Sequence, residues 1–336
     1  MAERTELVTS EAISLRMIEY GVELARDVGA TALLIIEACI GSGTNNVDFA
    51  HFTSVSRVYR STTITAFNSA DVPLPCVTIR AALAGMPFRV IMANRGAVPH
   101  ADPVFSHVTI PQVHLTRPGQ VKAALLIGLA RGLLKRGDRV VCLSGVDGAD
   151  AIDAMIVLTL GSEPEVFSTF DADTLGPDLE PEAFERLVSL ATQLAAEGRE
   201  GRPVGALFVL GDSERVLPMT RSLVLNPFLG YPKSDRNILD PLLEETIKEF
   251  SAIDGAFIIR GDGVVLAAGV QLLPTQPAIV LPIGLGTRHA AAAATTASTN
   301  AVAVAISQST GTVTIFREGT LIASLPRATG WSHLAG

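Results

Sequence analysis

Amphipathic helical segments alternate with short, continuous apolar runs in this chain, and this alternation constrains the fold more than any other feature. After Ser10, apolar residues recur every three or four positions up to Gly29, as in an N-capped helix. The run at 30–38 is almost wholly apolar and has the length of a strand. Residues 117–137 repeat the helical pattern and lead directly into the apolar run 138–145. The N-terminal half therefore predicts βαβ units and an α/β fold with a parallel sheet.

The C-terminal half alternates in the same way, but its strands gather toward the end. A short-hairpin sequence, Gly261-Asp262-Gly263, separates two apolar runs and predicts an antiparallel pair, hence a mixed sheet. Helices are expected over 180–198, 213–225, 240–253 and 288–298, and strands over 203–211, 254–260, 263–270, 301–307, 312–318 and 320–325.

A polar segment separates the two halves. Residues 162–180 concentrate Asp, Glu, Pro and Ser without an apolar period. The length of 336 residues is also about twice that of a typical single domain. We therefore expect two domains, 1–165 and 166–336.

Composition excludes several classes of partner. A net charge of −8 argues against sequence-independent binding to nucleic acid, and an aromatic content of 5% argues against a base-stacking platform. The N-terminus has no apolar signal region, and no uninterrupted apolar run reaches the length of a membrane span. Cys39, Cys76 and Cys142 stand in apolar contexts without a CxxC pair, as buried thiols do in a reducing compartment. We expect a cytoplasmic protein with no membrane partner.

Asp254 opens the expected strand 254–260 and is followed by the small residues Gly255 and Ala256. A carboxylate at a strand end, beside backbone left open by glycine, suits a metal-bound phosphate or the deprotonation of a hydroxyl. An ordinary helix-to-strand turn uses the same residues, so the triplet alone leaves both interpretations open.

Thr287, Arg288 and His289 stand at an expected helix start, after Gly284 and Gly286. The N–H groups of a helix N-terminus attract anions, and arginine offers a two-pronged donor to phosphate oxygens. The alternative is Thr287 as a helix cap, with Arg288 and His289 on a solvated first turn.

Together, three short motifs resemble those of the diadenylate cyclase (DAC) domain of the DisA type. They are Asp254-Gly255-Ala256, Arg288-His289-Ala290 and Ser307-Gln308, in the family's order. The flanking segments 197–212, 225–231, 236–257 and 284–292 are similar to the same family, so the resemblance covers about residues 166–325. Two positions depart from the motifs: Ala290 replaces a second arginine, and Gln308 replaces an acidic residue.

The resemblance implies an α/β DAC domain that condenses two ATP molecules into cyclic di-AMP and two pyrophosphates with Mn²⁺ or Mg²⁺. Asp254, Arg288 and His289 would be catalytic, with Asp254 and His289 binding the metal. The residues expected to bind nucleotide are Gly255, Ala256, Gly269, Leu272, Gly286, Thr287, Arg288 and Ser307. Since each domain holds one ATP, two DAC domains must face each other in a homo-oligomer. A nucleotide-binding sensor or scaffold, impaired by Ala290 and Gln308, is the alternative.

The first half resembles the C-terminal α/β domain of pyruvate kinase over 10–35 and 122–145. This resemblance implies a regulatory or assembly domain without catalysis, in the arrangement expected of archaeal-type diadenylate cyclases. A third hypothesis is that this domain binds a metabolite and regulates cyclase output. Asp147-Gly148-Ala149 repeats the Asp-Gly-Ala triplet without the other motifs, so we interpret it as a strand-to-helix loop.

Overall fold

The computed structural model describes residues 10–36, 86–95, 105–146, 151–162, 178–200, 202–274 and 285–327. The chain divides into two compact units, one of Met1–Val108 with Asp138–Thr159 and one of Thr109–Gly137 with Leu160–Gly336. Helix α3 (Arg117–Ala130) thus belongs to the C-terminal unit, a grouping that the sequence pattern does not indicate. The division into domains 1–165 and 166–336 stays a prediction.

The N-terminal unit is built on a sheet with the strand order β3-β2-β1-β4-β5. Strand β1 pairs in parallel with β2 and with β4, whereas β5 pairs antiparallel with β4. The predicted all-parallel sheet is therefore wrong at this edge, because the link between β4 and β5 is too short for a parallel crossover. Helix α1 (Ser10–Asp27) packs against this sheet. The strands are β1 (Ala32–Ile36), β2 (Arg89–Asn94), β3 (Ser106–Thr109), β4 (Arg139–Ser144) and β5 (Ala154–Thr159).

The C-terminal unit contains a mixed sheet in the order β12-β11-β10-β6-β8-β9-β7, as its sequence predicts. Strands β6 and β8 are parallel neighbours, while β8 and β9 form the predicted antiparallel pair. The strands are β6 (Leu207–Leu210), β7 (Thr220–Ser222), β8 (Ala256–Ile259), β9 (Val265–Leu272), β10 (Val302–Ile306), β11 (Val313–Arg317) and β12 (Thr320–Leu325).

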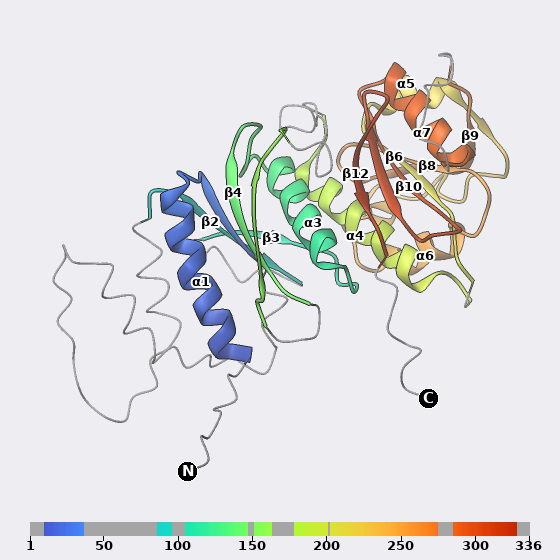
Figure 1. Cartoon of the computed structure of the whole chain (residues 1–336). Coiled ribbons are helices and arrows are strands. Elements are labelled where there is room, and N and C mark those ends of the chain that lie inside the picture. Colours follow the sequence, from blue (N-terminus) through green and yellow to red (C-terminus); the bar gives the residue numbers. More distant parts are fainter. Residues whose placement is uncertain are drawn as a thin grey trace, which may run out of the picture. The chain divides into compact units, whose positions relative to one another are not determined.

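Helices cover both faces of this sheet (Figure 1). Helix α7 (Thr287–Ser298) packs through small residues, including Ala292 and Ala293, on an apolar cluster that contains Phe316. The opposite face carries α4 (Pro181–Glu197), and α6 (Leu243–Phe250) is joined to α4 by the ion pair between Lys248 and Glu197. On this face, Phe208 and Phe257 stack with their ring centroids 4.9 Å apart. Because adjacent strand residues point to opposite faces, the central strands β6, β8 and β10, which are buried at every position, contribute to both cores.

The helix predicted over 213–225 is wrong beyond its first turn. Helix α5 (Ser213–Val216) passes into a short 3₁₀ turn at Leu217–Met219 and then into strand β7. Pro218 lacks the N–H that an α-helix needs to continue, and pairing with β9 satisfies the backbone that follows. Within the described residues, no helix is long and apolar enough to cross a membrane.

Replacing Phe257 with alanine should lower the free energy of unfolding by about 3–5 kcal/mol, because the ring is fully buried against Phe208. Urea denaturation of the full chain, followed by circular dichroism, measures the change. Leu225→Ala is the matched control, since this side chain is 96% exposed and its loss should change stability by no more than about 0.5 kcal/mol. Equal denaturation midpoints for the two variants would contradict the assigned core.

Candidate active site

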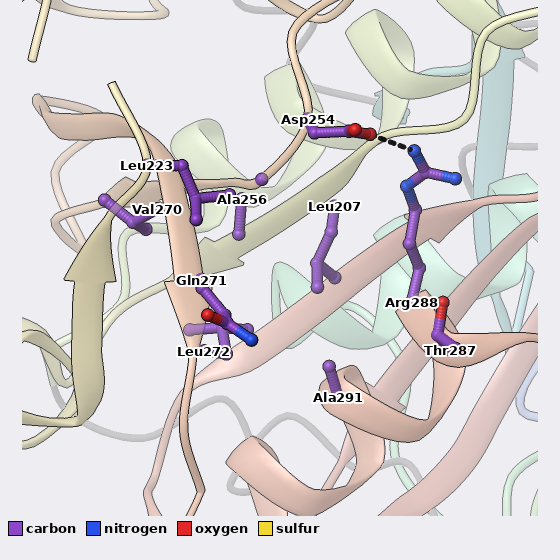
Figure 2. Close-up of a pocket in the computed structure, with 11 residues that line it drawn as sticks. Leu207, Leu223, Asp254, Ala256, Val270, Gln271, Leu272, Thr287, Arg288 and Ala291 are labelled. Carbon is purple, nitrogen blue, oxygen red and sulfur yellow. Dashed lines mark hydrogen bonds and ion pairs between the residues drawn. The ribbon is translucent and has the colours of Figure 1, made fainter. Parts of the chain in front are cut away.

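A pocket of about 610 Å³ opens where β6, β8 and α7 begin (Figure 2). The parallel register pairs Leu207 of β6 with Ala256 of β8, so the residues that precede both strands lie at one edge of the sheet. Helix α7 starts at the same edge and brings Thr287 and Arg288 to the pocket. Three elements that are distant in sequence thus supply one site.

Asp254 and Arg288 form the charged side of this pocket. Nη2 of Arg288 donates a hydrogen bond to Oδ1 of Asp254 across 3.3 Å. The Asp254 side chain is 92% exposed, so most of its carboxylate remains accessible to a ligand. An exposed ion pair of this kind adds little stability, which makes a structural role a poor explanation for it.

Gly255 lets the chain at the start of β8 approach strand β9 closely beside Asp254. A Cβ atom on Gly255 would lie 2.7 Å from the backbone of Gly269 and Val270, and its φ of +118° disfavours any other residue. The glycine in the Asp-Gly-Ala motif is therefore required by the backbone that carries Asp254.

Gly205, two residues before β6, leaves room for the guanidinium of Arg288. A Cβ atom at this position would lie 2.7 Å from Nη1 of Arg288 and 3.0 Å from Cβ of Gln308. Gly205 is not among the residues that the sequence predicts to be functional. The one signal for it in the sequence is a glycine two positions before a buried strand.

Apolar side chains form the rest of the pocket. They are Leu207 of β6, Val270 and Leu272 of β9, and Leu223 in the segment after β7. Figure 2 shows Leu223 and Val270 across the pocket from Asp254 and Arg288. A pocket with one apolar and one charged side suits a ligand that joins a flat ring to an anionic tail.

Six of the predicted site residues meet in this pocket: Asp254, Gly255, Ala256, Leu272, Thr287 and Arg288. The others lie outside its lining. The carbonyl of Gly269 accepts a hydrogen bond from the N–H of Leu223, and Gly286 precedes the first turn of α7. Oγ of Ser307 lies 3.2 Å from Oγ of Ser309 in the turn after β10. Gly284 and the triplet at Asp147 fall outside the described residues.

His289 points into the protein interior rather than into the pocket. Its side chain is 5% exposed, and its ring lies 6.1 Å from that of Phe316. Burial, with a smaller contribution from the Arg288 charge, lowers the pKa of His289. Successive helical residues point about 100° apart, so Arg288 reaches the pocket while His289 faces the sheet. The structure does not bring His289 together with Asp254, and the described residues contain no cluster of three metal-ligating side chains.

Comparisons with known proteins match this chain in two parts. Residues 193–321 match the family described as DisA bacterial checkpoint controller nucleotide-binding, and residues 45–167 match a probable sensor domain, DacZ_P. A diadenylate cyclase of Haloferax volcanii is 33% identical over 199 residues, which cover 59% of this chain and 71% of that protein. This chain belongs to the diadenylate cyclase family.

A second diadenylate cyclase, from Methanocaldococcus jannaschii, is 29% identical over 328 residues and spans both halves, with 94% of this chain and 98% of that protein covered. A solved structure of DacA from Staphylococcus aureus overlaps 42% of this chain and 84% of that one, with 23% identity and a TM-score of 0.30. The N-terminal match is to a probable sensor domain, so the resemblance to pyruvate kinase stays a prediction.

Burial of His289 should make the stability of this cyclase depend on pH. The folded state keeps the ring neutral, while the unfolded chain binds a proton below the ordinary imidazole pKa of about 6.5. The unfolded state then holds more protons, so the free energy of unfolding falls as pH drops through that value. His289→Gln should reduce this dependence in urea denaturation between about pH 5 and 8. An unchanged dependence would show that His289 protonates in the folded protein.

Proposed function

We propose that this member of the diadenylate cyclase family condenses two ATP molecules into cyclic di-AMP and two pyrophosphates at the pocket formed by β6, β8, β9 and α7. One observation carries the proposal: an exposed carboxylate contacts a guanidinium on the charged side of a pocket whose other side is apolar. In this arrangement the adenine packs on Leu223, Val270 and Leu272, and the phosphates lie at Asp254 and Arg288.

The chemistry is a nucleotidyl transfer that occurs twice. The 3′-hydroxyl of one ATP attacks the α-phosphorus of the other, forming a P–O bond as the bond to pyrophosphate breaks. Asp254 accepts the hydroxyl proton, since its carboxylate is open to the pocket. Arg288 stabilises the negative charge on the α-phosphate oxygens. The positive end of the helix dipole, at the N-terminus of α7, stabilises the same charge.

The residues present fit a divalent metal held mainly by substrate. Mg²⁺ commonly binds one or two carboxylates together with phosphate oxygens, and Asp254 offers one such carboxylate. When bound, Mg²⁺ or Mn²⁺ would neutralise phosphate charge. We keep Asp254 as the metal ligand and assign His289 a structural role, because its ring is buried against Phe316.

A single domain supplies only half of the reaction, so the proposal includes a homo-oligomer in which two DAC domains face each other. The attacking hydroxyl and the attacked phosphorus belong to different ATP molecules, each bound in its own pocket. Apolar side chains are exposed beside the pocket: Leu223, which lines it, is followed by Leu225, Leu229 and Tyr231, all exposed. Such a surface is typical of a site of association.

The sensor alternative rests on Ala290 and Gln308. Ala290 lies outside the pocket lining, so the missing arginine leaves the contact between Asp254 and Arg288 in place. Gln308 lines a neighbouring compartment and retains an oxygen that can accept hydrogen bonds. The site therefore favours catalysis.

We further propose that residues 166–336 form the DAC domain, that 1–165 form a pyruvate kinase-like regulatory or assembly domain, and that the protein is cytoplasmic.

Asp254→Asn should reduce cyclic di-AMP formation by roughly 100-fold or more, because it removes the proton acceptor with little change in volume. Chromatography of nucleotides after incubation with ATP and Mn²⁺ or Mg²⁺ measures the product. Asp147→Asn is the matched control, because Asp147 opens the other Asp-Gly-Ala sequence of the chain, and this variant should retain activity within a few-fold. A folded Asp254→Asn protein that makes product at the parental rate would exclude Asp254 from the chemistry.

Activity should depend steeply on enzyme concentration. Below the dissociation constant of the facing dimer, the rate of product formation should rise with nearly the square of protein concentration, since both half-sites must meet. Leu225→Lys should shift this regime to higher concentration by placing a charge on the exposed apolar surface. Constant specific activity in a protein that light scattering shows to be monomeric would contradict the facing arrangement.

A further inference from the structure

A second compartment of about 360 Å³ adjoins the proposed nucleotide pocket. The two share Asp254 and Arg288, which line both. Gly205 also lines the second compartment, at the point where its missing side chain leaves room for the Arg288 guanidinium. The contact between Asp254 and Arg288 therefore stands at the border of two connected spaces.

A tight turn at the end of α4 forms another wall of the second compartment. The N–H of Arg199 donates to the carbonyl of Arg202 across 2.9 Å, and the N–H of Arg202 donates back across 2.8 Å. These two bonds fix the backbone at both ends of the turn, and both arginines line the compartment. The turn is thus a fixed support for two guanidinium groups.

The two arginines differ in what they contact. Arg199 forms ion pairs with Glu245, at 3.4 Å, and with Glu249, both on α6. Arg202 is exposed, and its side chain forms no ion pair or hydrogen bond with any residue in the described ranges. Arg202 is therefore the guanidinium of this turn that is available to a ligand.

We propose that this second compartment receives the β- and γ-phosphates of ATP and then the departing pyrophosphate, with Arg202 and Arg288 as its cationic contacts. The inference rests on the proposed function. If adenine packs on the apolar side of the first pocket and the α-phosphate lies at Asp254 and Arg288, the remaining phosphates extend beyond that pair. In an in-line transfer the leaving group departs opposite the attacking oxygen, which also requires space there.

The charges of the compartment agree with a polyphosphate bound together with a divalent metal. Three carboxylates line it beside the arginines: Glu200, Glu249 and Asp254, which it shares with the first pocket. Glu249 is ion-paired with Arg199, so its charge is largely compensated. Arginine binds phosphate oxygens through paired, charge-assisted hydrogen bonds. Among the described residues that line the first pocket, Arg288 is the one arginine.

Isothermal titration calorimetry of the full chain with Mg²⁺ tests this assignment, with ATP, AMP and pyrophosphate as probes. The ATP probe is 3′-deoxy-ATP, which lacks the attacking hydroxyl and is therefore not consumed during the titration. Arg202→Ala should weaken the binding of pyrophosphate and ATP by roughly 10- to 150-fold, the usual effect of losing charged hydrogen bonds. AMP lacks the β- and γ-phosphates, so its affinity should not change. Arg215→Ala is the matched control: Arg215 is 60% exposed, on α5 after the C-terminal end of β6, and all three affinities should persist.

Three results would overturn the inference: no binding of pyrophosphate to the parental chain, unchanged pyrophosphate affinity in Arg202→Ala, or an equal loss of AMP and ATP affinity in that variant. Failure of the proposed function looks different. A chain that binds ATP and pyrophosphate through Arg202 but forms no cyclic di-AMP would keep the compartment and lose the cyclase assignment. If Arg202→Ala forms cyclic di-AMP and pyrophosphate inhibits it as strongly as it inhibits the parental chain, the cyclase assignment stands and the assignment of the compartment fails.

Discussion

The parallel pairing of β6 and β8 is the constraint on which the site depends. Since Leu207 pairs with Ala256, the residues two positions earlier, Gly205 and Asp254, emerge at the same edge of the sheet. Asp254 provides a carboxylate, and Gly205, which has no side chain, leaves space beside it. The guanidinium of Arg288 enters that space from α7 and reaches Asp254. A shift of one residue in this register would turn the side chains toward the opposite face and separate the three groups.

An ion-pair network holds the elements around this edge. Lys248 on α6 is 4% exposed and contacts Glu197 at the end of α4, together with Glu244 and Glu245 of its own helix. Burial opposes its charge, but the hydrogen bonds to Glu244, Glu197 and Glu245 raise its pKa. Buried ion pairs contribute more reliably to orientation than to stability. Here they join the helix that ends at the Arg199 turn to the helix that leads to Asp254.

Sequence patterns predicted much of the C-terminal unit because its signals are local. The hairpin at Gly261-Asp262-Gly263, the strands after residue 300 and the start of α7 each follow from a few neighbouring residues. The motifs also named Asp254 and Arg288, which contact each other in the structure. Strand β7 was missed because the apolar residues of the longer segment 213–225 are spaced as in a helix, and only pairing with β9 makes Thr220–Ser222 a strand. His289 was misplaced because a motif gives order along the chain and not direction around a helix.

The alanines of α7 have a consequence for how this site can vary. Their small side chains let the helix lie close to β10 and β11, over Ala303, Ala305 and Phe316. Arg288 stands on the first turn of the same helix. A larger side chain in place of one of these alanines would therefore tilt α7 against the sheet and displace the Arg288 guanidinium. Selection for a well-placed Arg288 therefore also acts on residues deep in the core, because the methyl groups of these alanines set how α7 lies on the sheet and so where its first turn stands.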